Sequence, residues 1–245
     1  MVRTIDYDSR RKQVLAATIN RYIKIAEPIS SEEIARSFDL SPATIRNIFA
    51  ELEQDGYLTH PYTSGGRIPT NKGYRYYVDF LALEMQILEE EKERIIREYR
   101  SRIRRLEDAL ERTSEVISQI THYTGMVSSL EWEDKLFYGG MSRVLEQPEF
   151  QDLGRTLGLI RMIEDKARIL DIVNREFDER VKVYIGEEMR CPEMSGCSLV
   201  VSTYSRKRRL CGRIAVLGPV RMEYSHIIPS IEYISEVLSE VLETI

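Results

Sequence analysis

Arg46 and Asn47 stand side by side in a segment with helical periodicity, and both side chains suit the reading of DNA bases. An arginine can make two hydrogen bonds to the edge of a guanine, and an asparagine can do the same with an adenine. Two small residues, Ala43 and Ala50, lie on the same side of the predicted helix and would let its backbone approach the bases closely. An ordinary amphipathic helix can also expose an arginine and an asparagine, so the prediction depends on the neighbouring elements.

The sequence marks both ends of this helix. Ser41 can cap the amides of the first turn, Pro42 suits the first helical position, and Gly56 ends the periodic segment. Apolar residues recur at offsets of three and four and predict one buried stripe. The stripe consists of Ile45, Ile48, Phe49 and Leu52.

The elements on both sides of the helix predict a winged helix-turn-helix domain. Upstream, helical spacing covers residues 9–25, and Ser30 or Ser31 can cap a short second helix. Downstream, residues 57–60 and 67–69 are typical of two short strands, joined by a glycine-containing connection that permits positive φ. Such a wing can approach a phosphate backbone or a minor groove.

The predicted DNA contacts fall into two groups. The residues expected to face bases are Ala43, Thr44, Arg46 and Asn47. The residues expected to hold the phosphate backbone are Ser41, Thr63, Ser64, Arg67 and Lys72.

Charge is divided unevenly along the 245 residues. Residues 1–80 hold 11 Lys and Arg against 10 Asp and Glu, whereas the remainder holds 24 against 30, which gives a net charge of −5. A balance of +1 predicts only modest sequence-independent affinity for phosphate. Specific binding should therefore rely on base contacts and on the pairing of two subunits.

Composition also predicts what the protein lacks. No apolar run reaches membrane-spanning length and the first residues carry no signal core, so we expect a cytoplasmic protein. The three cysteines match neither a CxxC pair nor a zinc knuckle, and the three histidines lie far apart. We therefore expect reduced structural thiols, no metal, no cofactor and no enzymatic activity.

Helical spacing continues from Asn71 to about Ser118 and predicts one long connecting helix with an apolar seam. The seam residues expected at a dimer interface are Ile96, Tyr99, Ile103, Leu106, Leu110, Ile117 and Ile120. Such a seam can pair two subunits in a coiled coil, or it can pack against the second domain of the same chain. Both alternatives stay open.

Beyond Gly140 the pattern predicts an α+β domain. Strands are expected at residues 181–185, 197–204 and 210–217, and a helix begins near Tyr224. The basic turn at residues 205–209 could reach DNA phosphate, although a turn kept soluble by its charge is the simpler explanation. The predicted domains are the winged-helix DNA-binding domain at residues 1–80, the connecting helix at residues 81–124 and the α+β domain at residues 125–245.

Several motifs resemble the family of the bacterial heat-inducible transcription repressor HrcA. They include EPISSEEIARSFDLSPATIRN and HPYTSGGRIPTNKGYRYYVD near the N-terminus, and VLEQPEF and VLGPVRMEYSHIIPSIEYISEVLSEVL downstream. The resemblance implies a dimeric repressor that binds double-stranded DNA at an inverted repeat ahead of chaperone genes. It also implies that the GroEL chaperonin keeps the repressor active and that heat shock inactivates it.

The resemblance further implies a GAF-like second domain interrupted by a dimerising insert. Here residues 125–130 run almost directly into residues 135–140, so the insert and early GAF-like strands are expected to be missing. The expected architecture is α+β: an N-terminal winged helix-turn-helix, a long connecting helix and a reduced GAF-like domain. Two other functions remain: a ligand-gated regulator that senses a small molecule, and a protein that uses its winged helix for protein contacts alone.

Overall fold

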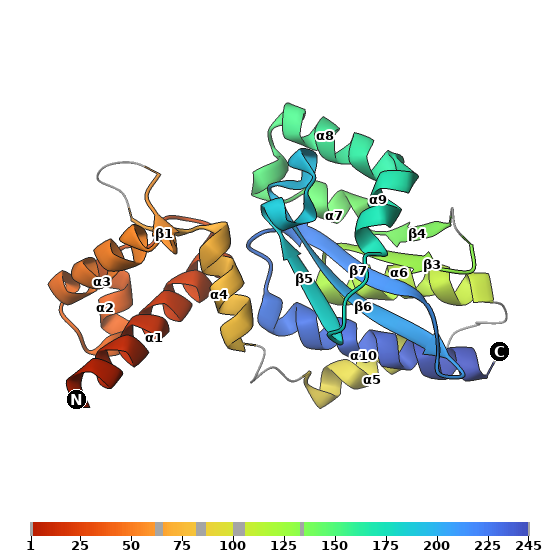
Figure 1. Ribbon diagram of the computed structural model, residues 1–245, viewed down its shortest axis with the longest axis horizontal. Coiled ribbons are helices and arrows are strands. Elements are labelled where there is room, and N and C mark those ends of the chain that lie inside the picture. The colour runs from red at the N-terminus through yellow and green to blue at the C-terminus, as the bar shows by residue number, and fades with distance from the viewer. Residues whose placement is uncertain (1, 62–65, 82–86, 100–105, 133–134, 245) are drawn as a thin grey trace. The chain divides into compact units, whose positions relative to one another are not determined.

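The computed structural model describes residues 2–61, 66–81, 87–99, 106–132 and 135–244 (Figure 1). The chain forms two compact units, Met1–Glu84 and Met85–Ile245. Helices and antiparallel strands occur in both units, which confirms the predicted α+β class.

The first unit has a core of three helices, followed by a wing and a fourth helix. The helices are α1 (Val2–Ile25), α2 (Ser31–Phe38), α3 (Pro42–Gln54) and α4 (Asn71–Leu81), and the antiparallel wing strands are β1 (Leu58–Thr59) and β2 (Ile68–Pro69). The first three helices pack together through buried apolar residues, which include Val14, Leu15, Ile19, Ile34, Ile45, Ile48 and Leu52. This order of elements confirms the predicted winged helix-turn-helix.

Local sequence explains the ends of α2 and α3. The Ser30 hydroxyl accepts a hydrogen bond from the Glu33 amide at 3.2 Å, and the Ser41 hydroxyl accepts one from the Thr44 amide at 3.1 Å. Both caps satisfy amides that have no partner inside the helix. Gly56 has a φ of 76°, a conformation that glycine adopts without strain, and it lets the chain leave α3 for β1.

The second unit is built on an antiparallel sheet with the strand order β4-β3-β7-β6-β5. The strands are β3 (Thr124–Ser129), β4 (Leu136–Gly139), β5 (Val181–Ile185), β6 (Cys197–Arg206) and β7 (Arg209–Pro219). The helices are α5 (Glu89–Tyr99), α6 (Leu106–Thr121), α7 (Met141–Leu145), α8 (Leu153–Glu164), α9 (Lys166–Val173) and α10 (Tyr224–Glu243). Three short 3-10 helices are η1 (Pro148–Phe150), η2 (Gly186–Met189) and η3 (Pro192–Met194).

Helices cover both faces of this sheet. α6 and α10 lie on one face, and α7, α8 and α9 lie on the other (Figure 1). In β7, Ala215 and Leu217 belong to the apolar cluster shared with α8 and α9, and the alternate residues Ile214 and Val216 are buried on the opposite side. Because both faces are covered, β6 is buried from Cys197 to Ser202 and β7 is buried from Gly212 to Pro219.

The prediction of one long connecting helix is wrong. α4 ends at Leu81, residues 87–88 lie outside any helix, and α5 and α6 are separate helices that pack on each other. Arg94 of α5 donates a hydrogen bond to the carbonyl of Gln119 in α6 at 3.2 Å. The apolar side of α6 packs on its own sheet, so α5 and α6 are part of the second unit and do not form a separate domain.

The segments on both sides of the expected deletion are strands. β3 and β4 form a hairpin with pairs from Gly125↔Gly139 to Ser128↔Leu136, and the loss of an insert and of early GAF-like strands between them stays a prediction. Farther along, β5 coincides with the predicted residues 181–185 and α10 begins at Tyr224 as predicted.

Candidate nucleic-acid interface

The outer face of α3 carries the predicted base-reading residues. Ala43, Arg46, Asn47 and Ala50 are exposed and Thr44 is half-buried, whereas the predicted apolar stripe is buried. Within the part of the chain that the structure describes, no hydrogen bond or ion pair engages the side chains of Arg46 and Asn47. Both side chains are therefore available to an external partner.

Ser41 caps the N-terminus of α3, which is the end of the helix nearer to Ala43, Thr44, Arg46 and Asn47. Besides accepting from the Thr44 amide, the Ser41 hydroxyl lies 2.9 Å from the Thr44 hydroxyl. The first turn of a helix carries unpaired amides and a partial positive charge, both of which favour a phosphate. The Ser41 cap therefore orients this end of α3.

A groove runs beside α3, between the N-terminus of α2 and the wing. Its lining residues are Ile29, Ser30, Ser31, Arg46, Phe49, Gly66 and Arg67. The sequence identified Ser30 and Ser31 only as possible helix caps, and the structure places them beside Arg46. A helix N-terminus next to an arginine suits a phosphate oxygen, so the capping pattern is the sequence signal that could have added these two serines to the predicted contacts.

Arg67 is held at the base of the wing. Its backbone exchanges hydrogen bonds of 2.8 and 2.9 Å with Ile29, and a Cβ at Gly66 would lie 2.6 Å from the Ile29 carbonyl oxygen. The Arg67 guanidinium pairs with Glu53 at 2.9 Å, and Glu53 also contacts His60. Glu53 of α3 therefore partly neutralises the charge of Arg67, and the predicted contact of Arg67 with the phosphate backbone stays a prediction.

Lys72 lies at the other end of α3. Its Nζ donates to the Asp55 carbonyl at 2.7 Å and lies 4.7 Å from the centre of the Tyr57 ring. A cation at the last carbonyls of a helix stabilises it. Because Asp55 follows Arg46 by nine residues, the two points are roughly 13 Å apart along the helix axis. The remaining predicted phosphate contacts, Thr63 and Ser64, lie outside the described residues.

The predicted seam residues of α6 are buried in the core of their own chain. Leu110 and Ile117 are 0% exposed and Ile120 is 2% exposed, where α6 packs on β3, β4 and α10. Ile96 and Leu106 are half-buried, and Ile103 and the side chain of Tyr99 lie outside the described residues. This burial favours the alternative in which the seam packs against its own domain.

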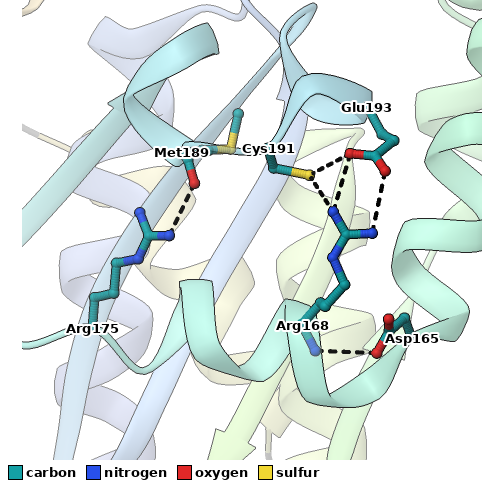
Figure 2. Close-up of polar contacts among 6 residues, drawn as sticks. All are labelled: Asp165, Arg168, Arg175, Met189, Cys191 and Glu193. Carbon is teal, nitrogen blue, oxygen red and sulfur yellow. Dashed lines mark hydrogen bonds and ion pairs between the residues drawn. The ribbon is translucent and has the colours of Figure 1, made fainter.

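A polar cluster joins α9 to the 3-10 helices after β5 (Figure 2). Arg168 donates to the two Glu193 carboxylate oxygens at 3.1 and 3.2 Å and lies 3.7 Å from the Cys191 sulfur, and Asp165 caps α9 through the Arg168 amide at 3.3 Å. The hydrogen bonds from Arg168 are the largest cause that lowers the pKa of Glu193 to about 2. Burial raises the pKa of the Cys191 thiol, and it raises the pKa of Cys197 to about 12. Both thiols therefore stay protonated at neutral pH, as expected of structural cysteines.

The described residues offer little for other chemistry. Among them, no three or more His, Cys, Asp and Glu residues are grouped so that they could hold a metal ion. No described helix combines the length and the apolar character that crossing a membrane requires. The space between the sheet and α8 and α9 is filled by apolar side chains, including Met126, Leu159 and Leu199.

Two family models match the chain. The model of the winged helix-turn-helix transcription repressor, HrcA DNA-binding, matches residues 7–79, and that of the HrcA protein C terminal domain matches residues 128–228. The heat-inducible transcription repressor HrcA of Desulforudis audaxviator is 30% identical over 337 aligned positions, which span 96% of this chain and 98% of that protein. The chain belongs to the HrcA family.

Other relatives agree with this assignment. The HrcA repressors of Pelotomaculum thermopropionicum and Desulforamulus reducens are 29% and 30% identical, over 97% of this chain and 97% and 98% of those proteins. A crystal structure of a hypothetical protein superimposes with a TM-score of 0.80 at 18% identity, covers 96% of this chain and 98% of that chain, and supports the fold alone. Membership of the HrcA family confirms the predicted winged-helix transcription repressor.

HrcA relatives contain residues that this chain lacks. The first alignment has 337 positions and the chain has 245 residues, so at least 92 positions are gaps in this chain. A shortened form was expected from the sequence. Assignment of the missing insert to the connection between β3 and β4 stays a prediction.

Proposed function

We propose that this HrcA-family repressor binds an inverted-repeat operator as a dimer, with one α3 helix in the major groove of each half-site. The observation that carries the proposal is the exposed pair Arg46 and Asn47, whose side chains have no partner among the described residues. Two recognition helices related by a two-fold axis match an inverted repeat. Their combined base contacts offset the low positive charge of the DNA-binding unit.

The proposed roles divide between bases and backbone. Arg46 and Asn47 hydrogen-bond to base edges, while Ala43 and Thr44 lie against the bases. Phosphates meet the capped N-termini of α2 and α3, at Ser30 and Ser41. Further predicted backbone contacts are Thr63, Ser64 and Lys72. Arg67 acts by holding the wing against α3 through Glu53.

Selection of bound duplexes from a random pool tests this proposal without any assumption about the operator. The expected result is enrichment of two half-sites in inverted orientation at one fixed spacing. Sedimentation of the protein with the selected duplex should give two chains per duplex. Enrichment of a single half-site bound by one chain would contradict the dimer, and no enrichment would contradict sequence-specific binding.

The heat response is the second part of the proposal. The relatives are named heat-inducible repressors, and we extend this property and the control of chaperone genes to the present chain. Operator binding by the purified protein should fall on heating in parallel with loss of the near-UV circular dichroism of the second unit. Binding that persists after the second unit has lost its tertiary structure would contradict this coupling.

Dependence on the GroEL chaperonin belongs to the same proposal. Chaperonins bind exposed apolar side chains, and α8 exposes Leu153 and Leu157 one turn apart. GroEL added during refolding should increase the fraction of chains that bind the operator, and Leu153→Ser/Leu157→Ser should reduce that increase. Equal recovery of operator binding with and without GroEL would contradict it. Because the target is chromosomal DNA, the proposed location is the cytoplasm.

A further inference from the structure

We infer that a second DNA-contacting element lies in the second unit, at the end of the β6–β7 hairpin. The element is the cationic tip, residues 206–209, whose sequence is Arg-Lys-Arg-Arg. It binds phosphates of the DNA backbone and reads no bases. This inference rests on the proposed function and adds to it a contact that the winged helix does not supply.

The charge of the cationic tip is not neutralised within the chain. No described acidic side chain forms an ion pair with any of its four side chains, and the last three residues are exposed. Glu243 of α10 approaches the tip but accepts a hydrogen bond from the backbone amide of Lys207. Elsewhere in the second unit, Arg168 and Arg180 have acidic partners. The exposed cations Arg161 and Lys166, which have no acidic partner among the described residues, stand singly. Four adjacent free cations are therefore unusual for this acidic part of the chain, and they suit a polyanion.

The hairpin projects beyond the sheet (Figure 1). Pairing of β5 with β6 ends at Ser202, and pairing of β3 with β7 ends at Gly212. One further backbone hydrogen bond joins the Leu130 amide to the Cys211 carbonyl at 2.8 Å. Beyond Cys211 the two strands of the hairpin stay paired with each other up to Arg206↔Arg209. A two-stranded ribbon has the width that a DNA major groove admits, and a turn at its end can approach the phosphates that border the groove.

The turn is built from residues that do not favour it. Lys207 and Arg208 have φ values of 50° and 60°, and hairpin turns of this shape normally use Asn-Gly. Contacts from α10 hold the tip in place, since the Ser205 amide donates to the Ser239 hydroxyl at 3.1 Å and the Lys207 amide donates to Glu243. Lys207 and Arg208 occupy backbone conformations that Asn and Gly would adopt with less strain. Their presence at these positions therefore indicates that their positive charge has a function, such as the binding of an anion.

DNA is the partner that the rest of the molecule favours. Residues 1–80 have a charge balance of only +1, and ion pairs already engage Arg11, Arg21 and Arg67 of the first unit. Additional phosphate contacts would supply the affinity that this unit lacks. Since both units are in one polypeptide, binding of α3 to its site raises the local concentration of DNA around the cationic tip.

The test is the double variant Lys207→Asn/Arg208→Gly in the full chain. Asn-Gly suits the positive φ values, so the thermal midpoint should stay unchanged or rise. Two fewer phosphate contacts in each chain should make the slope of log affinity against log salt concentration shallower by about 1.8 per bound chain, which is about 3.6 for the proposed dimer, and should weaken binding at least tenfold at low salt. Operator and scrambled duplexes should weaken alike, which fluorescence anisotropy over a salt series would measure.

The matched control is Arg161→Gln/Lys166→Gln, which removes the same two charges from exposed, unpaired positions of α8 and α9. This control should keep the wild-type slope. An unchanged slope in Lys207→Asn/Arg208→Gly would overturn the inference, because the tip would then make no phosphate contact. Equal weakening in both variants would overturn it too, because net charge alone would then be the cause. If the proposed function itself were wrong, the wild-type protein would show no preference for operator over scrambled DNA. This result differs from every result that would overturn the inference about the tip alone.

Discussion

Two amphipathic helices, α3 in the first unit and α6 in the second, both bury an apolar stripe, but only α3 was found to keep a polar face with the base-reading side chains that the sequence predicted. The outer face of α3 is polar and carries Arg46 and Asn47 without partners among the described residues. On α6, the apolar residues that could have formed an outward seam are buried instead, and Ile117 is fully covered. α3 therefore keeps a face for an external partner, whereas α6 serves the stability of its own unit.

The difference shows what an amphipathic pattern means in a folded chain. An apolar stripe is covered by whichever surface the fold provides, because burial removes apolar area from water in any case. A polar face with long, unpaired donors gains nothing from folding and becomes useful only when a ligand arrives. Variants of the two helices should accordingly affect different properties.

The largest effect is expected from Ile117→Ala in α6. Ile117 packs against Gly125 of β3, and the loss of its buried side chain should lower the free energy of unfolding by about 2–5 kcal/mol. Urea denaturation measures this value, with the exposed Glu111→Gln of the same helix as the control that stays near wild type. A loss of stability that appears only at low protein concentration would instead place Ile117 between two subunits.

Arg46→Ala should have the next largest effect, and it should appear in DNA binding alone. Loss of a two-point contact to a base is expected to cost about 1–3 kcal/mol of discrimination at one operator position. The free energy of unfolding should stay within about 0.5 kcal/mol of wild type, because the residue is exposed and unpaired. Equal losses on operator and random duplexes would contradict base reading by this arginine.

Lys72→Met distinguishes between two roles of Lys72 at the C-terminal end of α3: capping of the helix and binding of a phosphate. If Lys72 mainly caps the helix at the Asp55 carbonyl, the free energy of unfolding should fall by about 0.5–1 kcal/mol. The ratio of operator to scrambled binding should stay the same. Unchanged stability together with weaker binding to all duplexes would show that Lys72 holds a phosphate, as the sequence predicts.

The smallest effect concerns Arg168, which unlike Arg46 is paired within its own chain. Arg168 is the largest cause of the low pKa of Glu193, so the charged carboxylate is favoured in the folded state. The contribution to stability is present above the unfolded pKa and is lost as pH falls through about 2. NMR titration should place the Glu193 midpoint near 2 in the wild type, and Arg168→Met should raise it. A midpoint that does not move would contradict the ion pair of Figure 2.

Local signals in the sequence predicted the elements of the DNA-binding unit well. Ser41 and Pro42 define the start of α3, and the spacing of its apolar residues correctly separates its buried and exposed sides. These features depend on neighbours within a few residues in the chain, so they can be read without a structure. The same holds for β5 and for the start of α10 at Tyr224.

Long-range contacts explain what the sequence could not predict. Offsets of three and four occur both in coiled coils and in helices that pack on a sheet, so the seam around Ile117 could not identify its partner. Long side chains can reach several groups, and only the fold places Glu53 beside Arg67 and the Asp55 carbonyl beside Lys72. The packing of α5 on α6 is likewise a contact within the second unit that helical spacing does not predict.

The central proposal is that a dimer presents two α3 helices to an inverted repeat. Its most direct test is fluorescence anisotropy with three duplexes: the full inverted repeat, a single half-site and a scrambled sequence. Each duplex is titrated with the full chain over a series of salt concentrations. The account predicts strong preference for the full repeat, with the half-site bound much more weakly and the scrambled duplex weakest. Equal weak binding to all three duplexes would contradict it, because α3 would then read no bases and no dimer would join two readers.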